Sequence, residues 1–242
     1  MHWFEYLLLF VIIFLSGWSF LLLGKNNEML LKLSLAFSGA FLFTISIIHL
    51  IPSLFQQGGS KAGYFILAGF FLQIIIEFFS EGIEHGHTHQ HSSGEKTFPL
   101  TMMAGLSLHS FLEGMPLEGN FNHNHNHSHN HVLLTGIILH HIPVALALMS
   151  MLSVSGLGKA KSLLWLAVFA LMAPLGALTS RMLMNADLEM SPHFFDYTMA
   201  VVVGIFLHIS TTILFESNKN HHFNLFKLIT VLAGGIIAMW LF

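Results

Sequence analysis

Two apolar stretches of the chain carry side chains that could bind a metal ion. In the first stretch, His109 and Glu113 are four residues apart, so both would lie on one face of a helix. In the second, His140 and His141 are adjacent, and their directions around a helix would differ by about 100°. Three imidazoles and one carboxylate suit Zn²⁺ and would also accept Fe²⁺, Co²⁺, Ni²⁺ or Mn²⁺. We therefore predict a divalent metal site formed by these four side chains.

Each of the two stretches also contains a proline. Pro116 cannot donate a hydrogen bond to the carbonyl of Leu112, and Pro143 cannot donate one to the carbonyl of Leu139. A backbone carbonyl without a hydrogen bond is tolerated at membrane depth only where it faces protein or water. Helices interrupted in this way build the pathways of transporters. The alternative is a histidine that joins two helices by a hydrogen bond. A lone histidine would favour that alternative, but three histidines and a glutamate on two proline-containing helices favour a metal pathway.

Five further ionisable side chains fall inside apolar stretches or at their ends. They are His49, Glu77, Glu81, His208 and Glu216. Each could line an entrance or exit route for the metal. Each could equally be an interfacial residue whose polar end reaches the lipid headgroups.

The composition identifies the elements that must position these residues. Of the 242 residues, 9% are charged and 54% are hydrophobic, whereas a soluble domain has about 25% charged residues. This composition excludes a disordered chain and argues against a soluble globule. The net charge of −3 provides no basic surface for nucleic acid. The absence of cysteine excludes disulfides and thiolate metal sites.

Apolar runs of sufficient length recur along the whole sequence. A bilayer core requires about 20 apolar residues per helix. Eight runs meet this requirement, at 4–23, 33–54, 62–80, 98–117, 132–152, 162–184, 197–215 and 224–242. We predict an all-α integral membrane protein in the lipid bilayer, with eight transmembrane helices in a single domain, 1–242.

The nine lysines and arginines predict the orientation of these helices, because cytoplasmic loops are enriched in them. With both termini outside, only Lys61 and Arg181 fall on the outer side. The other seven lie in or beside cytoplasmic loops: Lys25, Lys32, Lys96, Lys159, Lys161, Lys219 and Lys227. We therefore expect a multi-pass protein of the plasma or inner membrane with external termini.

Two connecting segments are rich in histidine. Residues 84–91 read EHGHTHQH, and residues 122–131 read NHNHNHSHNH. Neutral imidazole is the commonest metal ligand, so these His-rich loops could hold a local reservoir of metal. They could instead be solvated spacers that bind metal only incidentally.

Motifs of enzyme chemistry are absent from the sequence. It contains no H-E-x-x-H, no G-x-S-x-G and no phosphate-binding P-loop. We expect no enzymatic activity and no cofactor, with the divalent metal as a transported substrate.

Several stretches together resemble the ZIP family of zinc/iron permeases. They are LAFSGAFLFTISIIHLIP, LSLHSFLEG, ILHHIPVALAL and APLGALTS. The resemblance implies eight helices in a 3+2+3 arrangement, in which the outer triplets are inverted repeats and helices four and five build the transport site. It also implies a homodimer that moves zinc or a similar cation towards the cytoplasm by alternating access.

The family pattern assigns positions in this chain and also reveals departures. It places ligands at His109, Ser110, Glu113, His140 and His141.

Val144 stands where the pattern has a second glutamate, Ala145 replaces its glycine, and Ala173 stands where some members have a further glutamate. These departures put a two-metal centre in doubt. They also leave open an alternative, in which the chain is a membrane protein that does not transport metal and has a metal-binding or regulatory role instead.

Overall fold

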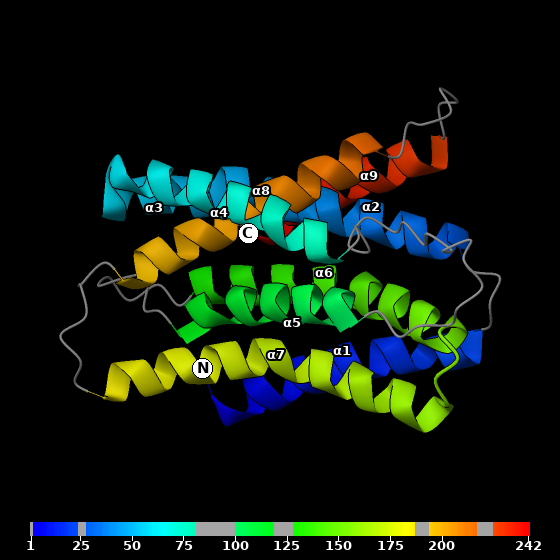
Figure 1. The fold of residues 1–242 in the computed structure, drawn as a ribbon. Coiled ribbons are helices and arrows are strands. Elements are labelled where there is room, and N and C mark those ends of the chain that lie inside the picture. The colour runs from blue at the N-terminus through cyan, green and yellow to red at the C-terminus, as the bar shows by residue number, and fades with distance from the viewer. Residues whose placement is uncertain (1, 24–27, 81–99, 119–127, 187–193, 217–224) are drawn as a thin grey trace.

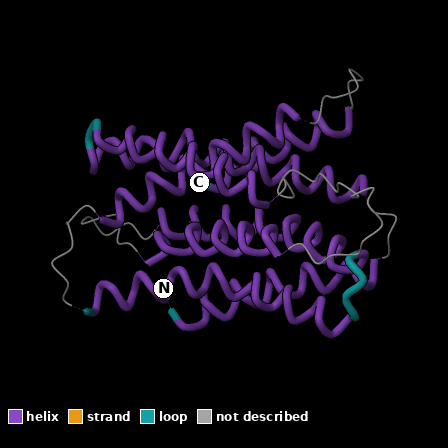
Figure 2. The backbone as a smooth tube through the Cα atoms, in the orientation of Figure 1, coloured by secondary structure: helices purple, strands orange, loops and turns teal. Residues whose placement is uncertain are grey.

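The computed structural model describes residues 2–23, 28–80, 100–118, 128–186, 194–216 and 225–242. All regular elements in these residues are helices (Figure 2). In chain order they are α1 (Trp3–Leu23), α2 (Glu28–Ile45), the π-helix η1 (Ser46–Leu50), α3 (Ile51–Gly58), α4 (Lys61–Ser80), α5 (Leu100–Gly114), the 3₁₀-helix η3 (Met115–Glu118), α6 (Ser128–Val154), α7 (Lys159–Asn185), α8 (Phe194–Glu216) and α9 (Leu225–Leu241).

Where the structure describes them, the predicted apolar runs form helices, so the prediction of an all-α chain is confirmed for these residues. Within the described residues, six helical segments are long and apolar enough to cross a bilayer. Two runs give shorter helices. α9 has 17 residues, and α5 has 15 residues before the chain continues as η3. The eight-span, 3+2+3 arrangement therefore remains a prediction.

The second predicted run forms one continuous helical segment that is longer than the run itself. It extends over Met29–Gly58 and contains the π-helical turn Ser46–Leu50 just before Pro52. A π-helical turn inserts one residue into the hydrogen-bond ladder, and such turns are frequent at functional sites. Here the turn carries His49.

The helices form two groups that lie one above the other in Figure 1. α4 packs mainly on α8 and α2 on α9, and α3 joins this group through α8. In the other group, α1 packs on α6 and α5 on α7. The groups meet where α2 contacts α6 and where α4 contacts α5. α5 and α6, which carry the predicted ligands, thus lie in the middle of the bundle.

Glycines allow the closest helix pairs to touch backbone to backbone. A methyl group on Gly69 of α4 would lie 1.9 Å from the carbonyl oxygen of Val201 on α8. A methyl group on Gly114 of α5 would lie 2.0 Å from the carbonyl oxygen of Ala173 on α7. Small residues of this kind are typical of packed helices in membranes.

Large apolar side chains cover much of the outside of the bundle. Exposed examples are Trp3, Phe71, Phe78, Phe226 and Trp240. Such a surface is unfavourable in water and stable against lipid tails. The bundle therefore has the surface of a protein that is embedded in a bilayer.

Candidate metal centre

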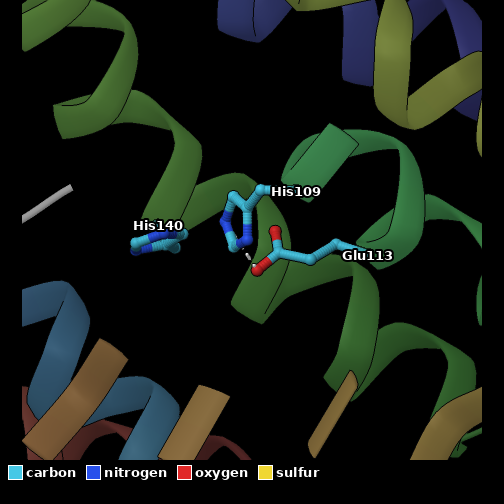
Figure 3. A group of neighbouring side chains, drawn as sticks. All are labelled: His109, Glu113 and His140. Atoms are coloured by element: carbon cyan, nitrogen blue, oxygen red, sulfur yellow. Dashed lines mark ion pairs between the residues drawn. The ribbon is translucent and has the colours of Figure 1, made fainter. Parts of the chain in front are cut away.

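α5 brings two of the predicted ligands into direct contact. His109 and Glu113 are one helical turn apart, and His109 Nε2 lies 3.0 Å from Glu113 Oε1 (Figure 3). Neither side chain is exposed to solvent. The i, i+4 spacing seen in the sequence is sufficient for this contact, because residues four apart are neighbours on a helix surface.

α6 supplies the third member of the group. One ligand atom from each of His109, Glu113 and His140 lies within 4.8 Å of the others. The rings of His109 and His140 are nearly perpendicular, with centroids 5.8 Å apart. Figure 3 shows His140 approaching the pair from its own helix. Two imidazoles and a carboxylate, all buried and with their ligand atoms close together, form a ligand set suited to zinc.

His141 lies beside this group, and both of its ring nitrogens have hydrogen-bond partners. Nδ1 lies 2.9 Å from the carbonyl oxygen of Ile137, so this nitrogen carries the proton and donates. Nε2, 3.0 Å from Ser110 Oγ, then accepts from the hydroxyl. His141 Nδ1 also lies 3.4 Å from Glu113 Oε2. His141 thus lies beside the carboxylate, and Ser110 binds the other nitrogen of its ring.

The sequence reasoning missed Gln73, a residue of α4 that contacts the centre. Its side chain is fully buried, and its Oε1 lies 3.2 Å from His109 Nδ1. The only signal in the sequence is an amide within the apolar run 62–80. Hydropathy alone does not identify the helix to which such an amide points.

The two prolines have different effects on the helices that carry the site. α5 gives way to 3₁₀-helix at Met115, so the change of helix type coincides with Pro116. α6 continues through Pro143 to Val154 as an α-helix. The sequence predicted an interrupted hydrogen-bond ladder in both helices. In the structure, the helix type changes at Pro116 and not at Pro143.

Apolar residues occupy the positions of the missing family carboxylates. Val144 is one turn after His140 on α6 and is buried. Ala173 is also buried, and its carbonyl oxygen lies against Gly114. Glu113 is therefore the one acidic member of the ligand group found in the described residues.

The weaker candidates lie outside this group. His208 Nε2 contacts Glu77 Oε2, which pairs α8 with α4. The ring of His49 lies against that of Phe242, with centroids 6.1 Å apart. Whether His49, Glu77 and His208 line a metal route remains a prediction.

The His-rich loops lie largely outside the described residues. The structure does not describe residues 84–91 or 122–127. α6 begins at Ser128, so the last four residues of the predicted tether 122–131 are helical. α6 therefore extends about one turn before the predicted apolar run 132–152.

Comparison with known proteins assigns the chain to a family. The model of the ZIP zinc transporter family matches residues 84–242, which include α5 to α9. The chain belongs to the ZIP zinc transporter family. ZIP proteins transport divalent metal ions, so the metal is a substrate, and the many apolar helices are those of a multi-pass membrane protein. Transport also agrees with the absence of enzyme motifs from this ZIP sequence. No curated protein matches the chain.

Proposed function

We propose that this ZIP protein imports zinc, or a similar divalent cation, towards the cytoplasm. The observation that supports this proposal is the buried group His109, Glu113 and His140. Buried ionisable residues within a membrane protein are costly and usually serve a pathway. His141 is the fourth candidate ligand. It would have to exchange its bond to Ser110 or Ile137 for the metal.

The proposed cycle is alternating access through this central site. α5 and α6 would move against the outer helices, so that the site opens first to one side and then to the other. The proposed architecture is eight spans in one domain, 1–242, arranged 3+2+3 with inverted outer triplets, and two chains would form a homodimer. No cofactor and no nucleic acid would take part.

The distribution of lysines supports the direction. Lys32, Lys159 and Lys227 lie near the starts of α2, α7 and α9, and these three helices begin at the same end of the bundle (Figure 1). α4 begins with Lys61 at the opposite end. Under the positive-inside rule, the end with more lysines is cytoplasmic. Both termini would then lie outside, in a plasma or inner membrane.

We further propose that the site holds one ion. Paired metal sites place the ions about 3.5–4 Å apart, and bridging carboxylates offset the repulsion between them. Only Glu113 is available in the group, because Val144 and Ala173 are apolar. A neutral imidazole can bind an ion but cannot bridge two.

Uptake of radioactive zinc into proteoliposomes that contain the purified chain tests the proposal. A transporter accumulates zinc above the amount that the protein binds, and competition with Fe²⁺, Co²⁺, Ni²⁺ and Mn²⁺ ranks its substrates. The alternative is a metal-binding or regulatory membrane protein that does not transport. The presence of Val144, where the family pattern has a glutamate, favours this alternative. That protein would retain only stoichiometric zinc.

A further inference from the structure

Gln73 is the buried polar side chain of α4 that needs an explanation. It lies in a mostly apolar helix, and its side chain is not exposed to solvent. Burying an amide without a hydrogen bond is unfavourable, because the amide loses its bonds to water. The hydrogen bond to His109 offsets that cost.

This hydrogen bond also determines which nitrogen of His109 faces the metal centre. The Gln73 Oε1 atom, 3.2 Å from His109 Nδ1, can only accept, so Nδ1 carries the proton. The other nitrogen, Nε2, lies 3.0 Å from Glu113 Oε1, on the side of the ring where the ligand group converges. A partner of this kind fixes the tautomer and the orientation of a metal-binding imidazole.

We infer that Gln73 is a positioning residue that holds His109 as an Nε2 ligand for the transported ion. The inference rests on the proposed function, because it needs His109 to be a ligand. It adds a residue from a helix outside the two that supply the predicted ligands.

The location of Gln73 gives the bond a second role. α4 packs on α8 in one helix group, whereas α5 packs on α7 in the other. The bond from Gln73 to His109 therefore joins an outer helix, α4, to α5, which would move against the outer helices in the proposed cycle. It strengthens metal binding in the conformation seen here, and its loss in another conformation favours release.

The test measures metal affinity in the full-length protein, with the His-rich loop histidines replaced by asparagine so that the central site alone is read. Zn²⁺ affinity is measured by competition with a chromophoric chelator, and Co²⁺ absorption reports the geometry of the site. Gln73→Met should weaken Zn²⁺ binding about 10–100-fold and change the Co²⁺ spectrum. Gln73→Glu should retain both, because a carboxylate also accepts from Nδ1. Gln56→Met, the same change at an exposed site on α3, should have no effect.

Gln73→Asn provides a second variant in case the methionine variant does not fold. Its amide is one methylene too short to reach His109, so it should also weaken binding.

Unchanged Zn²⁺ affinity in either variant would overturn the inference. An equal loss of affinity in Gln73→Glu would also overturn it, because Gln73 would then contribute only packing. Zinc uptake by the wild type separates the two proposals. Uptake with no dependence of affinity on Gln73 contradicts only this inference. Binding that depends on Gln73 without uptake contradicts only the transport function.

Discussion

The backbone carbonyl of Ala173 occupies the space that a side chain on Gly114 would need. α5 and α7 are therefore in backbone contact directly after Glu113. We expect Gly114→Ala to destabilise the protein by at least the roughly 1–3 kcal/mol of an overpacked core, because the rigid carbonyl cannot give way. The fraction of monodisperse protein after heating measures the effect.

Gly158→Ala is the matched control for this change. Gly158 has φ −65°, and no atom lies within 4 Å of an added methyl group. Its variant should unfold at the wild-type temperature. If Gly114→Ala proved equally stable, the close contact of α5 with α7 would be wrong.

Replacement of Glu113 by glutamine should abolish zinc uptake while the protein still folds. The change preserves shape and removes the one negative charge of the ligand group, so a dication would face only neutral ligands. We expect a loss greater than the roughly 10–100-fold that follows removal of an outer-shell partner. Initial uptake rates in proteoliposomes measure it, and Glu5→Gln near the start of α1 serves as the control. Near-normal uptake by well-expressed Glu113→Gln would exclude the proposed site.

Val144→Glu should tighten zinc binding or permit a second ion. Val144 follows His140 by one turn, so a carboxylate there would lie on the same face of α6. Zinc is counted per chain after the loop histidines have been replaced. The wild type should hold one tightly bound ion. Val144→Gln, which adds polarity without charge, should not raise the count. Two tightly bound ions in the wild type, both lost in Glu113→Gln, would contradict the single-ion site.

Replacement of His123, His125 and His127 by asparagine should raise the zinc concentration needed for half-maximal uptake. These histidines lie in the loop that the lysine distribution places on the external side. A reservoir raises the local metal concentration and adds nothing to the conformational step, so the maximal rate should be unchanged. Uptake rates over a range of zinc concentrations separate the two quantities. A lower maximal rate at an unchanged half-saturation would show that the loop is no reservoir.

Much of the helical fold could be predicted from the sequence, for physical reasons. Apolar runs must form helices in lipid, because the backbone has no other hydrogen-bond partners there. His109 and Glu113 meet because four residues make about one helical turn, so their contact is local. His140 was expected near this pair because polar side chains are costly in lipid, so those of two apolar helices should face the same cavity.

Contacts between distant helices could not be predicted in this way. Gln73 and His109 are 36 residues apart, and Glu77 and His208 are 131 apart. Hydropathy shows that each helix is apolar, but it does not give the rotation of one helix against another. The hydrogen bonds of His141 could not be predicted for a related reason. Its bonds to Ile137 and Ser110 depend on side-chain rotamers, which residue spacing does not determine.

The presence of a single carboxylate among neutral imidazoles makes the proposed carrier sensitive to membrane voltage. With neutral histidines, the empty site carries a charge of −1 from Glu113, and a bound dication changes it to +1. An interior-negative potential would then draw the loaded site inward and push the empty site outward, by about 2.3 kcal/mol per charge for each 100 mV crossed. Both half-cycles of import would gain from the same potential, without a second ion. Zinc uptake should accordingly rise when a potassium gradient with valinomycin makes the vesicle interior negative, and an unchanged rate would exclude movement of the charged site through the field.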